Sequence, residues 1–215
     1  MKYDSPSSKP KAVIQFVPDP SSPKGCERFL TEALLEAGYA VGTADFFRSD
    51  AAPRVIRPNS REGQHLIGEI CSFYDRMEED EAEIRDLPRF LVGIGGGVMF
   101  AEYALDKACR VDGIIEIAPR SFIKEYLLTR KFLKRKRMLE RFPNVPIYIL
   151  GGDEDPESRR GDAVIVRAQA LSISEHDSVA FKIYPGAGHD ILNDDCRKHL
   201  LRDILFWLDA HLDEE

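Results

Sequence analysis

The feature of this sequence that most constrains its fold is the alternation of short apolar runs with longer amphipathic stretches. The runs are rich in Val, Ile, Tyr and Phe and are bounded by Gly or Pro, which is typical of strands buried on both faces of a sheet. We predict strands at Ala12–Val17, Tyr39–Ala44, Phe90–Ile94, Gly113–Ala118, Val145–Leu150 and Val179–Tyr184. We predict helices at roughly Gly25–Ala37, Glu62–Glu83, Gly97–Ala108, Ser121–Arg141, Arg159–His176 and Asp194–Leu212. This alternation predicts right-handed crossovers and an α/β fold, with a mostly parallel sheet of six or slightly more strands and helices on both faces.

The composition places the chain among ordinary globular proteins. Its 215 residues are 43% hydrophobic and 31% charged, which suits one domain, expected at 12–215. The polar start of the sequence predicts a flexible tail at 1–11 and no secretory leader, and no apolar run is long enough to span a membrane. Because the four cysteines lack metal-ligand spacing, we expect reduced thiols and a cytoplasmic protein.

Charge and motif spacing exclude other classes of protein. Lys and Arg number 30 against 37 Asp and Glu, a formal net charge of −7 that argues against nucleic acid as a partner. The five histidines show no metal-ligand spacing, so we expect no metal site and no cofactor. The glycine run Gly93–Gly97 resembles a phosphate-binding turn, but the dinucleotide pattern G-x-G-x-x-G needs a glycine where Val98 stands.

The residues that follow each predicted strand indicate the chemistry, because the working residues of parallel α/β sheets lie outside the carboxyl ends of the strands. His189 follows the last run inside YPGAGHD, where glycines allow a turn that presents an imidazole. Asp155 follows the preceding run inside ILGGDEDP and could accept the Nδ1–H of that imidazole, with Asp153 as its competitor. An acid followed by a histidine, both after a nucleophile, is the chain order of a hydrolytic triad on such a sheet.

With these residues the chain resembles the α/β-hydrolase superfamily, and most closely its dienelactone hydrolase-like branch. The resemblance covers roughly residues 11–212 and is carried by AGYAVGTADFF, FLVGIGGGVMFAEYAL, YILGGDEDP, YPGAGHDI and ILFWLDAHL, in that order. It implies hydrolysis of esters, lactones or thioesters by acyl transfer, and a small-molecule ester, lactone or carboxylate-bearing ligand. By position it implies Asp155 as the acid and His189 as the histidine of the triad.

The departure from the family pattern lies at the nucleophile. The elbow motif G-x-S-x-G carries its nucleophile at the centre, and the centre of GIGGG here is Gly95, which has no side chain to form an acyl-enzyme. Gly96 could still donate its N–H to an oxyanion. The segment VPDPSS stands where a second donor is common, and Pro18 and Pro20 have no N–H to donate. We therefore predict that ordinary acyl-enzyme activity is weak or absent.

Several interpretations of the remaining residues stay open. Asp155 and His189 could form an idle pair that ties two loops together, or His189 could activate a water in place of the serine. A substitute nucleophile could come from Ser121 or Cys196. A non-catalytic binding or interaction protein that uses the old cleft is the alternative from a different class. Such a protein would keep its affinity after His189→Ala, whereas a water-activating enzyme would lose its activity.

Ligand contacts are expected from two strand ends and one helix. Arg120, after the fourth run, is the basic residue best placed to bind a substrate carboxylate, and Asp19, after the first run, is a second candidate. Segment 121–142 is basic and amphipathic and is expected to form a helical cap. Its basic face is either solvated or attracts a carboxylate-bearing ligand, an acidic partner or a membrane surface.

Overall fold

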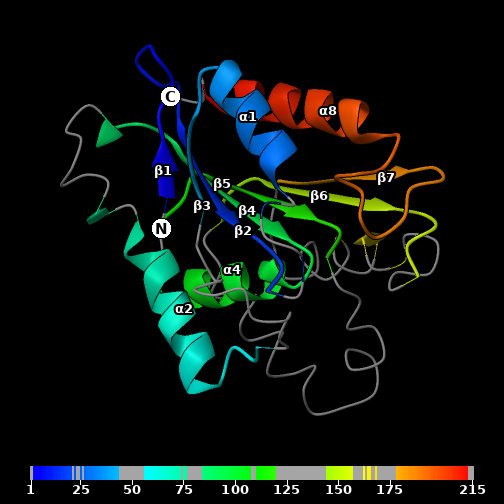
Figure 1. Ribbon diagram of the computed structural model, residues 1–215, viewed down its shortest axis with the longest axis horizontal. Coiled ribbons are helices and arrows are strands. Elements are labelled where there is room, and N and C mark those ends of the chain that lie inside the picture. Colours follow the sequence, from blue (N-terminus) through cyan, green and yellow to red (C-terminus); the bar gives the residue numbers. More distant parts are fainter. Residues whose placement is uncertain are drawn as a thin grey trace.

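The computed structural model contains a sheet of seven strands among its described residues (Figure 1). Their order across the sheet is β1-β3-β2-β4-β5-β6-β7. Every neighbouring pair is parallel except β1 and β3, which run antiparallel. The strands are β1 Lys2–Asp4, β2 Val13–Val17, β3 Ala40–Thr43, β4 Arg89–Ile94, β5 Gly113–Ile117, β6 Ile147–Gly152 and β7 Val179–Tyr184. The predicted α/β class and all six predicted strands are confirmed.

The structure describes residues 2–20, 27–43, 56–73, 84–107, 110–119, 144–156 and 178–212, with residues 22, 25, 75–76, 162, 164–165 and 168 between these ranges. The helices with assigned bounds are α1 Arg28–Glu36, α2 Arg61–Cys71, α4 Gly97–Asp106 and α8 Arg197–Ala210. The predicted helix and cap at 121–142, and most of the predicted helix at 159–176, lie outside the described residues. In the described ranges, no helix is both long and apolar enough to cross a membrane.

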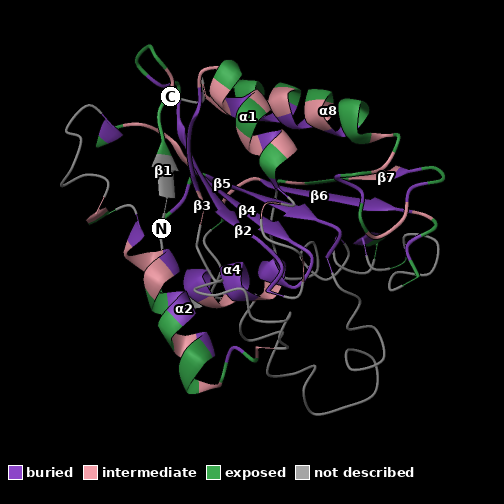
Figure 2. Ribbon diagram, viewed as in Figure 1, coloured by how far each residue is buried: buried purple, intermediate pink, exposed green. Residues whose placement is uncertain are grey.

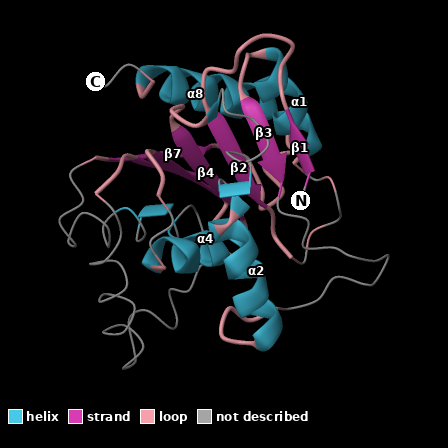
Figure 3. Ribbon diagram, turned by 90° about the vertical axis from the view of Figure 1, so that its left-hand side faces the viewer, coloured by secondary structure: helices cyan, strands magenta, loops and turns pink. Residues whose placement is uncertain are grey.

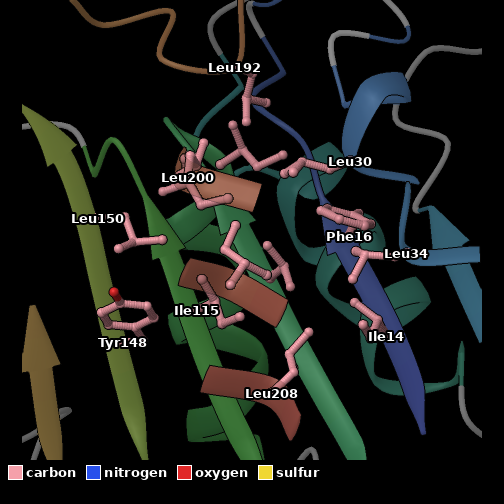
Figure 4. Packing of buried hydrophobic residues seen from close by; sticks show 14 of the residues in the cluster. Ile14, Phe16, Leu30, Leu34, Ile115, Tyr148, Leu150, Leu192, Leu200 and Leu208 are labelled. Atoms are coloured by element: carbon pink, nitrogen blue, oxygen red, sulfur yellow. The ribbon is translucent and has the colours of Figure 1, made fainter. Parts of the chain in front are cut away.

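Helices cover both faces of the sheet (Figure 3). On one face, Leu30 and Leu34 of α1 and Leu200 of α8 pack against Ile14 and Phe16 of β2 in a single buried cluster (Figure 4). On the other face, the apolar sides of α2 and α4 form a second cluster with the sheet. Strands β2, β5 and β6 are buried at every residue (Figure 2), because helices press on them from both sides.

Two aspartates of α8 join this helix to strand β7 and to residues that lie just before β2 and β3. Asp203 accepts hydrogen bonds from the Lys182 ammonium and the Tyr184 hydroxyl of β7, at 2.5 and 2.9 Å. Asp209 accepts hydrogen bonds from the Tyr39 hydroxyl at 2.7 Å and from the Lys11 ammonium at 3.0 Å. Helix α8 is therefore held by directed contacts as well as by apolar packing.

The structure differs from the expected elements at two places. Part of the predicted flexible tail is strand β1, which pairs with β3 from Lys2↔Thr43 to Asp4↔Val41. This strand has no apolar run of its own, and only the open edge of β3 gives it a partner. The helix predicted at Glu62–Glu83 is interrupted, because α2 ends at Cys71 with Ser72 as its C-cap, and residues 73, 75 and 76 are helical again, while 77–83 lie outside the described residues. The ring of Phe73 packs against Gly42 of β3, where a Cβ would lie 1.9 Å from it.

Candidate active site

The turn between β4 and α4 has the backbone of a nucleophile elbow. Gly95, at the predicted nucleophile position, has φ of +54°, a conformation that costs a residue with a side chain about 1–2 kcal/mol. Its N–H donates to the carbonyl of Ile117 on β5 at 2.8 Å, which fixes the turn to the neighbouring strand. Gly96 follows as the N-cap of α4. The turn thus has a left-handed residue at its centre, a conformation that glycine adopts without strain.

The loop after β2 lies against this turn. A Cβ added to Gly97 would fall 1.9 Å from the carbonyl oxygen of Val17, so no other residue fits there without moving the backbone. Because the loop lies this close to the turn, the side chain of Asp19 also packs against the turn, and Asp19 is 2% exposed. Its Oδ2 accepts a hydrogen bond from the Gly96 N–H at 2.8 Å. The residues expected to bind substrate and oxyanion, Asp19 and Gly96, thus bind each other.

The structure also brings the predicted acid and histidine together. Nδ1 of His189 lies 2.8 Å from Oδ2 of Asp155, and the Asp155 side chain is 1% exposed while that of His189 is 27% exposed. A buried carboxylate at this distance favours the tautomer of the imidazole that carries its proton on Nδ1.

Backbone contacts hold the two turns that carry this pair. Gly152, at the end of β6, lies so close to the turn after β7 that an added Cβ would fall 2.0 Å from the carbonyl oxygen of Ala187. The N–H of Glu154 donates to the same oxygen at 3.0 Å. Asp153 also connects the two turns, since its Oδ1 accepts a hydrogen bond from the Gly186 N–H at 2.6 Å. Of the two candidate aspartates, Asp155 is the one that contacts His189.

The other candidates have different outcomes. Arg120, Ser121 and the basic cap lie outside the described residues. Cys196 is the N-cap of α8, and burial raises the pKa of its thiol, which disfavours the reactive thiolate. Within the part of the chain that the structure describes, no group of three His, Cys, Asp or Glu side chains is arranged to hold a metal ion.

Comparison with known proteins gives a clear result for the fold. No family model and no curated protein sequence matches the chain. Among solved structures, a highly thermostable carboxyl esterase from Bacillus coagulans superposes with a TM-score of 0.77, at 17% identity, over 98% of this chain and 93% of its own. A monoacylglycerol lipase from Paleococcus ferrophilus gives 0.68, at 16% identity, over 98% of both chains. A putative α/β hydrolase from Agrobacterium tumefaciens gives 0.70, at 17% identity, over 100% of this chain and 91% of its own.

The chain therefore has the α/β-hydrolase fold. The resemblance seen in the sequence is confirmed at this level, and the working edge of such a sheet is the one at which the turns after β2, β4, β6 and β7 lie.

Proposed function

We propose that this protein is a dienelactone hydrolase-like member of the α/β-hydrolase fold, descended from hydrolases of esters, lactones or thioesters, whose own acyl-enzyme activity is weak or absent. The observation that carries the proposal is Gly95 at the centre of an elbow whose backbone is otherwise retained. An acyl-enzyme needs a nucleophilic side chain at this point, within reach of the histidine base. Glycine supplies none.

The pairing of His189 with Asp155 favours a second candidate, hydrolysis by a water that His189 activates. The pair has the geometry of a general base, with Nδ1 held at 2.8 Å from a buried carboxylate. Loss of one triad member in a well-studied protease leaves about 10³–10⁴-fold catalysis over water, so the residual rate would be low. A non-catalytic binding protein is the remaining alternative, and it predicts no turnover at all.

Turnover of a panel of p-nitrophenyl esters and simple lactones tests the proposal. The parent chain is compared with His189→Ala and with His199→Ala, a control at an exposed histidine of α8. We expect no burst of product, no covalent adduct with a fluorophosphonate probe, and the same background rate in all three proteins. A burst or an adduct in the parent would contradict the proposal.

Slow turnover without a burst would favour the water-activating candidate, provided that it disappears in His189→Ala and persists in His199→Ala. Its rate should also fall at acid pH with the protonation of an imidazole, whose ordinary pKa is about 6.5.

A further inference from the structure

One buried side chain at the elbow takes no part in the function proposed above, the carboxylate of Asp19. We propose that Asp19 occupies the position of a substrate oxyanion and so blocks acyl transfer a second time, independently of the missing nucleophile. The inference rests on the proposed function in one respect, because it takes the turn at Gly95 to be descended from an acyl-transfer site.

Two distances place the carboxylate. Oδ2 of Asp19 accepts the Gly96 N–H at 2.8 Å, and this N–H, on the residue after the nucleophile position, is a donor that an oxyanion needs. A Cβ added to Gly95 would lie 2.6 Å from the same Oδ2. The carboxylate therefore fills both the space where a nucleophilic side chain would begin and the acceptor position on the donor.

The electrostatics of the turn hold Asp19 in this position. Gly96 is the N-cap of α4, where the positive end of the helix dipole attracts an anion. Asp19 is 2% exposed, so water screens its charge little. A substrate carbonyl brought to this point would find the Gly96 N–H occupied and would develop its negative charge beside a carboxylate. That arrangement is the reverse of the stabilisation that an oxyanion hole provides.

It follows that a restored nucleophile is not sufficient for activity. Gly95→Ser alone places its Cβ against the Asp19 carboxylate and leaves the Gly96 N–H occupied. Asp19→Ala together with Gly95→Ser vacates both positions. Because the loss of one oxyanion donor costs about 10²–10³-fold in kcat, we expect the double variant to hydrolyse esters about 100-fold faster than Gly95→Ser, or more.

The first test measures p-nitrophenyl acetate hydrolysis and fluorophosphonate labelling in the parent, Asp19→Ala, Gly95→Ser and the double variant. The control is Asp19→Asn with Gly95→Ser, which keeps the side-chain volume and an acceptor oxygen, and should stay as slow as Gly95→Ser. Equal rates in Gly95→Ser and in Asp19→Ala/Gly95→Ser, whether high or absent, overturn the proposal. Labelling of the unmodified parent would instead contradict the proposed function, so the two failures are distinguishable.

The second test probes the position without catalysis. Asp19→Ala leaves a space of carboxylate size beside the Gly96 N–H, and formate should fill it. We expect a saturable formate-dependent shift of the Gly96 amide resonance in Asp19→Ala, and none in the parent or in Asp19→Asn. An equal shift in the parent, or none in Asp19→Ala, contradicts the assignment. If Asp19→Ala does not fold, Asp19→Ser takes its place with the same expected result.

Discussion

The contact between Gly95 and Asp19 predicts a specific effect of Gly95→Ala on stability. The new Cβ would lie 2.6 Å from Oδ2 of Asp19 and 3.2 Å from its Cβ, so the carboxylate must shift and its hydrogen bond from the Gly96 N–H is distorted. Loss of this charge-assisted hydrogen bond costs about 1.5–3 kcal/mol. The φ of +54° adds about 1–2 kcal/mol for a residue with a side chain. With part of the hydrogen-bond energy and all of the backbone strain lost, Gly95→Ala should lower the free energy of unfolding by about 2–4 kcal/mol.

The same change should cost much less once Asp19 is gone. In Asp19→Ala the hydrogen bond is already lost, and only the backbone strain of about 1–2 kcal/mol remains. The double variant should then be about 2 kcal/mol more stable than the sum of the two single effects predicts.

Unfolding in urea, followed by fluorescence of Trp207, the single tryptophan of the chain, gives all four free energies. Gly186→Ala is the matched control, because Gly186 has φ of +73° and nothing within 4 Å of an added Cβ. Its cost should add to that of Asp19→Ala. Additivity of Gly95→Ala with Asp19→Ala, to within about 0.5 kcal/mol, would refute the reasoning.

Three further predictions concern the scaffold. Burial alone would raise the pKa of Asp203, but hydrogen bonds led by that of Lys182 outweigh it and lower the pKa below 3.8. Asp203→Asn should thus lower the free energy of unfolding, measured in urea at neutral pH, by about 1–2 kcal/mol. This difference should shrink as the pH falls below about 4, because the carboxyl of the unfolded chain then takes up its proton. Burial raises the pKa of Tyr148 to about 12, and burial with a carboxylate acceptor raises the pKa of Tyr39 still further above 10.0. Stability should therefore fall as the pH rises above 10. Between pH 10 and the pKa of about 12 of Tyr148, phenolate absorbance from these rings should appear mainly with unfolding, whereas their ionisation in the folded protein near pH 10 would contradict the prediction. Ser60 caps α2 by accepting the Gly63 N–H at 3.0 Å, so Ser60→Ala should lower the free energy of unfolding by about 1 kcal/mol, and Ser60→Asp by much less.

The sequence was sufficient for the central sheet, because buried parallel strands are continuous apolar runs and these are visible without any tertiary information. Val179–Tyr184 was predicted to the residue. Strand β1 could not be found in this way, since Lys2–Asp4 is short and polar and depends on the edge of β3. Pairing at the edge of a sheet depends on where distant segments meet in the folded chain, and the residue pattern within one segment does not indicate it.

The candidate site was predictable in part for the same reason. In parallel α/β sheets the functional residues follow the carboxyl ends of the strands. This rule selected four residues from the sequence, all of which follow strands that end at one edge of the sheet: Asp19, Gly95, Asp155 and His189. It could not show that Asp19 reaches the Gly96 N–H, which requires the approach of the loop after β2 to the turn after β4. The only hint was the unbroken glycine run, since Gly97 leaves room for that approach.

The turns at this edge of the sheet form two halves, each held together by its own set of contacts. One half joins the ends of β6 and β7 through Gly152, Glu154 and Ala187 and carries the histidine pair. The other joins the ends of β2 and β4 through Gly97 and Asp19. The contacts described above for the first half all lie between the turns after β6 and β7, so we expect a mutation at position 95 to leave the imidazole and its carboxylate in place. On the function proposed above, an ancestor could have lost its nucleophile in one step and kept a well-formed histidine pair without selection for catalysis.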